Sequence, residues 1–157
     1  MMTPIFPGNP TSVNLQGRWT LELRGPDGEI KRVVQSENVV CTNGKEFLAS
    51  LLYSCALAAA TNTAKYIAIG SDSTSEAAAN TALGTETSRH TGTVSYVSNQ
   101  IYRVTATFAT GSGTGNVYEM GVLSSNSAGT LLNRNTIGLI TKGANDTLKV
   151  ICDLTIS

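Results

Sequence analysis

The sequence has few charged residues and no excess of either sign. Lysine and arginine number 11, aspartate and glutamate 11, and together they make up 14% of the chain, against about 25% in typical soluble domains. A chain without net positive charge lacks the electrostatic footprint of a nucleic-acid-binding protein and the basic cluster that attracts an anionic membrane. We therefore expect no nucleic-acid partner and no membrane partner. The surface is expected to consist instead of threonine, serine, asparagine, glycine and alanine. Such a surface is typical of proteins that other proteins cover, although some Thr- and Ser-rich β proteins are monomers.

The chain has only three cysteines, an odd number. Cys41, Cys55 and Cys152 are far apart in apolar surroundings, which predicts buried free thiols rather than a disulfide framework. Free thiols favour assembly in a reducing cytoplasm. The sequence also lacks a secretory signal and an apolar run of about 18 residues, so we expect no membrane span.

The residues that catalysis and metal binding need are sparse. His90 is the single histidine, and no serine-hydrolase, zinc-site or phosphate-loop motif accompanies it. The alternating oxygen ligands of Asp72–Glu76 could suggest a calcium loop, but a surface turn explains them better because the central glycine and further acidic groups are missing. The sequon at Asn145 is also explained by a turn, since no secretory signal accompanies it. We predict a non-enzyme with no catalytic residue, no cofactor and no metal site.

What the sequence does have is β-strand periodicity. Its 157 residues suit one domain, which at this size buries about 70% of its unfolded surface and needs no metal or disulfide to fold. Apolar and polar residues alternate over 19–24 and 148–156, and a turn motif at 25–28 predicts a hairpin. A helical spacing of apolar residues predicts one α-helix near 43–60. The predicted fold class is mainly β, a β-sandwich or jelly-roll-like domain over residues 17–157 with that helix inserted.

Shorter strands are predicted between these segments. Tyr102, Val104, Ala106 and Phe108 should share one face of a strand that begins at Ile101. Four of the other predicted strands lie at 29–34, 66–69, 85–89 and 93–97. A further strand is predicted to carry Tyr118, Met120 and Val122 on one face. Two more are predicted, one beginning at Leu131 and one at 137–140. Small polar residues predict loops at 74–82 and 111–115.

Residues 1–16 are predicted to form an extended N-terminal arm. Three prolines within the first ten residues exclude a regular helix or central strand, yet four apolar residues stand among them and after them. They are the candidate protein-interaction residues, Ile5, Phe6, Val13 and Leu15. The arm could fold back on its own domain, could be a disordered end, or could lie on a neighbouring subunit.

Three stretches of the chain together resemble small virion proteins of tailed bacteriophages. They are NGKEFLASLL (43–52), YIAIGSDST (66–74) running on to NTALGTE (80–86), and KGANDTLKV (142–150). The resemblance covers about residues 40–150 and leaves the arm outside. It implies a structural role in a virus particle and brings no catalytic residues with it.

Two structural roles follow from this resemblance. The first is a capsid decoration, or cement, protein that binds the assembled head and stabilises it, and the second is a tail or fibre component that could bind a host receptor. The absence of repeats and heptads argues against a long fibre, and the loops at 71–80 and 111–115 lack the aromatic residues of a receptor site. The expected partners are the major capsid protein or other virion proteins and further copies of the chain. Three-fold positions recur on icosahedral shells, so we expect a homotrimer, located in the virion and assembled in the cytoplasm of the bacterial host.

Overall fold

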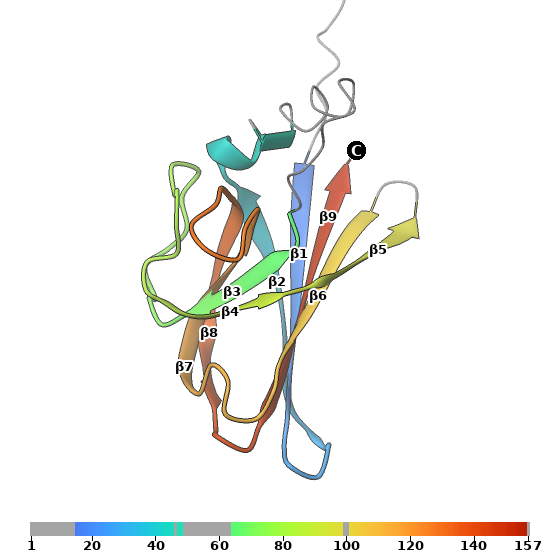
Figure 1. Ribbon diagram of the computed structural model, residues 1–157, viewed down its shortest axis with the longest axis vertical. Coiled ribbons are helices and arrows are strands. Elements are labelled where there is room, and N and C mark those ends of the chain that lie inside the picture. The colour runs from blue at the N-terminus through green and yellow to red at the C-terminus, as the bar shows by residue number, and fades with distance from the viewer. Residues whose placement is uncertain (1–14, 46, 49–63, 99–100, 157) are drawn as a thin grey trace, which may run out of the picture.

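The structure is a computed structural model that describes residues 15–45, 47–48, 64–98 and 101–156. Nine antiparallel strands form one sheet, and a short helix over 42–45 and 47–48 follows the second strand (Figure 1). The strands are β1 (Leu15–Arg24), β2 (Ile30–Val40), β3 (Tyr66–Gly70), β4 (Glu86–Thr91), β5 (Thr93–Ser98), β6 (Ile101–Phe108), β7 (Gly115–Leu123), β8 (Leu131–Lys142) and β9 (Thr147–Ile156). The prediction of a mainly β fold with one helix is confirmed. No helix in the described part of the chain is both long and apolar enough to cross a membrane.

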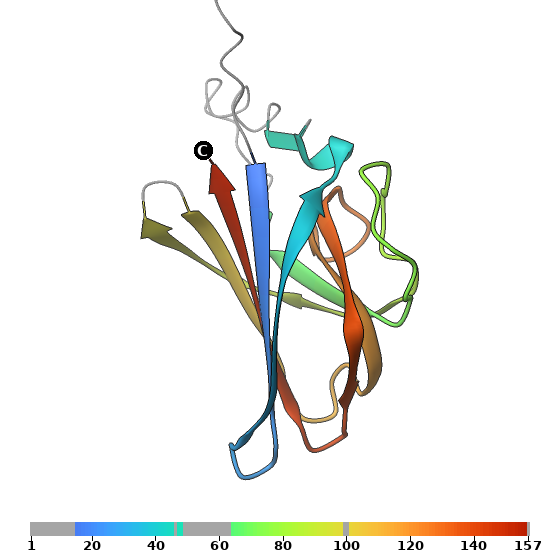
Figure 2. The same cartoon turned by 180° about the vertical axis from the view of Figure 1, so that it is seen from behind.

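The sheet curls until it nearly closes on itself, as Figures 1 and 2 show. Its strands lie in the order β4-β3-β7-β8-β2-β1-β9-β6-β5. Two halves of the sheet meet where Val39 and Val40 of β2 pair with Arg134 and Asn133 of β8. From this junction β2 and β8 diverge towards the β1–β2 turn (Figure 2). The result is a barrel-like sheet whose interior holds the core.

The core is made by the inward faces of strands from both halves of the sheet. The alternation predicted for β6 and β9 is confirmed where the side chains are described, because the intervening residues are more exposed than the buried Val104, Ala106, Phe108, Leu148, Val150, Cys152 and Leu154. The largest core cluster includes Trp19, Leu21, Ile67, Ile69, Val104, Ala106, Phe108, Met120, Leu148, Val150 and Cys152. Burying side chains of this size is the main favourable contribution to folding, at about 1.5–3 kcal/mol each.

The strands nearest the two ends of the chain follow the sequence pattern closely. β1 and β2 form the predicted hairpin, and β9 pairs with β1 on one side and β6 on the other. An apolar terminal strand is thereby kept from an exposed edge, where it would favour aggregation. Cys41 and Cys152 are buried free thiols, as predicted; Cys55 lies outside the described residues. Burial raises the pKa of the Cys152 thiol to about 12, so this sulfur is unreactive at neutral pH.

Two strands differ in detail from the sequence prediction. The segments expected to begin at Leu131 and to span 137–140 are one continuous strand, β8. On β7, the pairing with β8 shifts between Val117 and Glu119. This irregularity places Val117, rather than Tyr118, in the core together with Met120 and Val122.

The helix and the arm are only partly described. The helix predicted over 43–60 begins at residue 42 and is described to residue 48, and residues 49–60 lie outside the described part. Leu15 and Gln16, which were assigned to the arm, pair with Ile156 and Thr155 in the β1–β9 ladder. Ile5, Phe6 and Val13 lie outside the described residues.

Gly92 forms the corner at which the chain passes from one half of the sheet to the other. It is the only residue between β4 and β5, and its N–H donates to the carbonyl oxygen of Lys65 at 2.6 Å. A Cβ at this position would lie 2.6 Å from a methyl carbon of Val104 and 2.8 Å from the oxygen of Lys65. Only glycine fits without a shift of the neighbouring backbone.

We therefore expect Gly92→Ala to lower the free energy of unfolding by about 1–3 kcal/mol, the usual cost of overpacking. The matched control is Gly138→Ala on β8, where the nearest atom to an added Cβ is an Arg32 side-chain nitrogen at 3.9 Å. Urea unfolding of both variants measures the effect. Equal stability of the two variants would show that the Gly92 corner is not tightly packed.

Candidate functional site: a surface loop held by a buried ion pair

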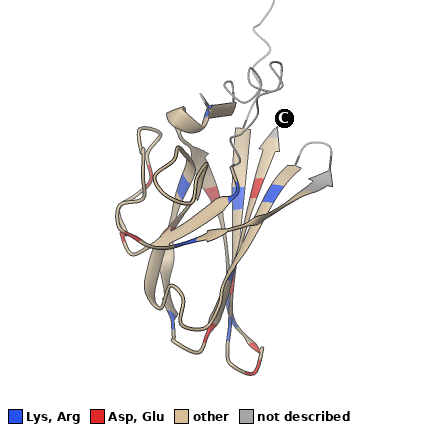
Figure 3. Cartoon of the chain, viewed as in Figure 1, with Lys and Arg blue, Asp and Glu red and all other residues tan. Residues whose placement is uncertain are grey.

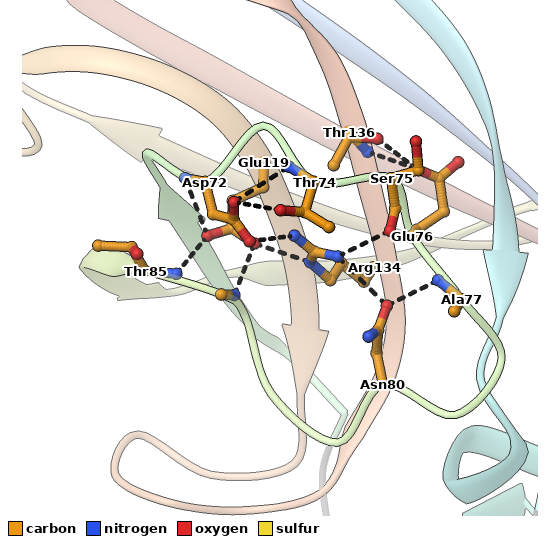
Figure 4. Close-up of polar contacts among 11 residues, drawn as sticks. Asp72, Thr74, Ser75, Glu76, Ala77, Asn80, Thr85, Glu119, Arg134 and Thr136 are labelled. Atoms are coloured by element: carbon orange, nitrogen blue, oxygen red, sulfur yellow. Dashed lines mark hydrogen bonds and ion pairs between the residues drawn. The ribbon is translucent and has the colours of Figure 1, made fainter.

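The loop between β3 and β4, residues 71–85, is attached to the sheet by charged groups (Figure 4). We call it the clamped loop. It lies over the outer face of β7 and β8, where Glu119 and Arg134 project towards it. The predicted loop at 74–82 lies within it.

Glu119 and Arg134 form a buried ion pair on neighbouring strands. Nε of Arg134 donates to Oε2 of Glu119 at 2.7 Å, and the two side chains are 2% and 0% exposed. Removing two charges from water costs several kcal/mol per ion unless each finds charged and hydrogen-bonding partners. The clamped loop supplies the remaining partners to both.

The carboxylate of Glu119 accepts hydrogen bonds from the loop backbone. Its oxygens receive the N–H groups of Thr85 at 2.7 Å, Gly84 at 2.9 Å and Asp72 at 3.4 Å. The two ends of the loop therefore converge on one acidic group, and each bond to an ionised acceptor is stronger than one to a neutral acceptor.

The guanidinium of Arg134 binds the start and the middle of the loop. It donates to Oδ2 of Asp72 at 3.1 Å, to Oδ1 of Asn80 at 3.2 Å and to the carbonyl oxygen of Ser75 at 3.5 Å. An arginine can make these contacts at once because its donors have a fixed planar arrangement. One buried side chain thus fixes three points of the loop.

Local turns within the loop use the same side chains. Oδ1 of Asp72 accepts from the N–H of Thr74 at 3.0 Å and from its hydroxyl at 2.8 Å. These bonds, together with the nearby Arg134, hold the pKa of Asp72 below its usual value. Oδ1 of Asn80 accepts from the N–H of Ala77 at 2.7 Å, and the carboxylate of Glu76 accepts from the N–H and hydroxyl of Thr136. The two carboxylates considered for calcium, those of Asp72 and Glu76, are thus bonded within the protein.

Gly70 is required where the loop leaves β3. A Cβ on Gly70 would lie 2.4 Å from both the carbonyl oxygen of Thr85 and Oε1 of Glu119. Leu83 anchors the far end of the loop in a second apolar cluster with Cys41, Ala68, Leu123 and Leu131. These contacts give a physical reason for residues in the IGSD and ALGTE parts of the stretch that resembles virion proteins.

The start of the helix is tied to the same loop. The N–H of Thr42 donates to the carbonyl oxygen of Ala78 at 2.9 Å. The residue just before the stretch 43–52 therefore contacts the loop that joins 66–74 to 80–86. The third stretch lies at the opposite end of the sheet (Figure 1). There the buried Lys142 donates to the carbonyl oxygen of Ala109 at 3.0 Å, and Lys31 pairs with Asp146 at 2.8 Å.

The exposed part of the clamped loop is uncharged and made of small residues. These are Ser73, Thr74, Ser75, Ala77, Ala78, Ala79, Thr81, Ala82, Gly84 and Thr85. The charges of Asp72 and Glu76 are bonded to Arg134 and Thr136 rather than free. The arrangement offers a surface of fixed shape, suited to contact with another protein, rather than a reactive group.

Sequence reasoning missed both charged residues that hold this loop. The available signal was a charge inside an otherwise strand-like segment, Glu119 between Tyr118 and Met120, and Arg134 between two asparagines. Charges in such positions are seldom fully buried unless they are paired. Leu15, the one predicted interaction residue that is described, is half-buried on β1 and does not contribute to the clamped loop.

His90 has a partner that the sequence did not reveal. Nε2 of His90 lies 2.7 Å from Oγ of Ser112, and the ring packs against Phe108 with centroids 4.6 Å apart. The 22-residue separation between His90 and Ser112 hid this contact from motif analysis. In the part of the chain that the structure describes, no group of three histidine, cysteine, aspartate or glutamate residues is placed to hold a metal ion.

Comparison of the chain with protein-family models, with curated proteins and with solved structures gives no match.

Proposed function

We propose that this chain is a structural protein of a bacteriophage particle, a decoration protein that binds the assembled head through the clamped loop and has no enzymatic activity. The observation that carries the proposal is the buried Glu119–Arg134 pair, which is devoted to holding an uncharged surface loop. The resemblance of residues 66–86 to virion proteins supports it, because the clamped loop lies within that range.

A fixed loop suits protein binding for an entropic reason. Ordering a mobile loop at an interface reduces affinity, so a loop already held in shape loses less on binding. A buried ion pair contributes little net stability compared with apolar residues of the same size. Its presence beneath a surface loop is better explained by a need to fix that loop than by a need for stability.

A decoration protein requires no chemistry of its own. A ligand that binds only the assembled shell stabilises the shell by mass action. A symmetric oligomer strengthens this effect because several weak contacts form together. The expectation of a trimer comes from the three-fold positions of an icosahedral shell. No residue of this chain specifies it.

The N-terminal arm belongs to the same proposal. Ile5, Phe6 and Val13, together with Leu15 at the start of β1, would contact a neighbouring virion protein such as the major capsid protein. Burying Ile5 or Phe6 there would contribute about 1.5–3 kcal/mol each. We further propose that the domain is related to jelly-roll sandwiches, since its two half-sheets face each other across one core.

The experiment uses heads that lack the protein. Purified chain added to such heads is expected to bind until a fixed number of sites is filled, and the heads should then release their DNA at a higher temperature or resist a chelator better. Tails from the same particles serve as the comparison. Binding to tails but not to heads would favour a tail or fibre component and would overturn the head assignment.

A further inference from the structure

The sheet has two end strands, β4 and β5, and they differ in how their free edges are protected. An end strand presents unpaired backbone N–H and C=O groups that can pair with another chain, and proteins usually guard such edges with charged side chains, proline or coverage. β4 carries Glu86 and Arg89, which form an ion pair. Arg89 also donates to the carbonyl oxygens of Ser125 and Ala128, so the 124–130 turn lies against it.

Within the described residues, β5 has no such guard. Its sequence, TVSYVS, contains no charged residue and no proline, and threonine, valine and tyrosine are residues that favour strands. Among the described residues, β5 pairs with β6 alone. The side chains of Thr93, Val94 and Ser95 are exposed, Val94 by 40%. Figures 1 and 2 show β5 at one end of the sheet, where no other described strand lies along its outer edge.

Charges of opposite sign alternate across the neighbouring strands. Across the outer face, Glu37, Arg18, Asp153 and Arg103 lie in register on β2, β1, β9 and β6 (Figure 3). Arg103, the member nearest to β5, makes two hydrogen bonds to Asp153, at 2.6 and 2.7 Å. This row of charged residues of alternating sign ends at β6. A second copy could therefore approach the β5 edge without meeting an unpaired charge.

We propose that the free edge of β5 pairs antiparallel with β5 of a second copy of the chain, so that the two sheets continue across a two-fold axis. A two-fold contact uses the same patch on both subunits, so the patch must be compatible with itself. β5 meets this condition because it brings no charge to face its own copy, whereas β4 brings two. Ser95 lies near the middle of the strand and hence close to the axis.

This contact leaves the clamped loop available. The loop lies beside β7 and β8, on the opposite side of the domain from β5 (Figures 1 and 2). Self-association through β5 does not depend on the proposed binding to phage heads. It predicts a dimer in solution, in contrast to the trimer expected from shell symmetry.

The test compares the full chain with Ser95→Lys. In a two-fold pair each added lysine stands opposite or next to its copy, and like charges across strands are unfavourable. Sedimentation velocity over a range of concentrations should show the unmodified chain passing from monomer to dimer, and Ser95→Lys remaining monomeric. Gln35→Lys, at an exposed position of the internal strand β2, is the control and should dimerise like the unmodified chain.

Hydrogen exchange provides a second readout. Amides of residues 93–98 should become slower to exchange as the concentration of the unmodified chain rises, and should not change in Ser95→Lys. Three results would each overturn the proposal. They are a monomer at all concentrations, a trimer, and a dimer that persists in Ser95→Lys with unchanged hydrogen exchange of the β5 amides.

Discussion

Replacing Arg134 by methionine is expected to lower the free energy of unfolding by about 3 kcal/mol, the lower end of the range for breaking a buried ion pair. Methionine keeps most of the side-chain length but leaves the carboxylate of Glu119 buried without its cation. The lower end applies because Glu119 keeps its hydrogen bonds from the N–H groups of Gly84 and Thr85. The loop should also exchange its amide hydrogens faster, since Asp72 and Asn80 lose the guanidinium that holds them.

The matched control is Arg103→Met. Arg103 also pairs with a carboxylate, that of Asp153, but its side chain is 35% exposed. Partly exposed pairs contribute about 0–1 kcal/mol, so this variant should unfold at nearly the same urea concentration as the unmodified chain. If Arg134→Met costs no more than Arg103→Met, the buried pair does not hold the loop and the candidate site loses its basis.

The second large effect concerns binding rather than folding. Ala79→Asp places a charge on the exposed part of the clamped loop and should weaken binding to phage heads by a factor of about 5 to 150. This range corresponds to about 1–3 kcal/mol, the cost of leaving one polar group unsatisfied in an interface. Because the backbone of the loop is fixed at both ends, the new carboxylate cannot easily move out of the contact.

The control for this substitution is Thr107→Asp. Thr107 is an exposed residue of β6, paired with Lys149 of β9 on the outer face of the other half-sheet. Both variants should have the thermal stability of the unmodified chain, and only Ala79→Asp should bind heads less tightly in a co-sedimentation titration. Equal affinity of the two variants would remove the loop from the binding surface.

Much of the fold could be predicted because some strands follow a simple pattern. Over 17–24 of β1, 104–108 of β6 and 147–154 of β9, buried residues alternate with more exposed ones, so a period of two in the sequence corresponds directly to the structure. β8 was divided into two predicted strands because Asn133, Arg134 and Asn135 interrupt its apolar residues. Two of these polar residues are buried with partners on other strands, Glu119 for Arg134 and Cys152 for Asn133.

The candidate site could not be predicted for the same reason. Glu119, Arg134 and Asp72 are separated by 15 to 62 residues, and only the pairing of β3 with β7 and of β7 with β8 brings them together. The shift in β7 that moves Tyr118 out of the core also has no marker in the local sequence. The role of the N-terminal arm remains a prediction, since residues 1–14 lie outside the described part of the chain.

The most direct test of the proposed function is a cryo-electron microscopy map of the intact particle in which this chain is located and counted. The account predicts many copies on the outside of the head, with the clamped loop turned towards the shell. A few copies confined to the tail would contradict it.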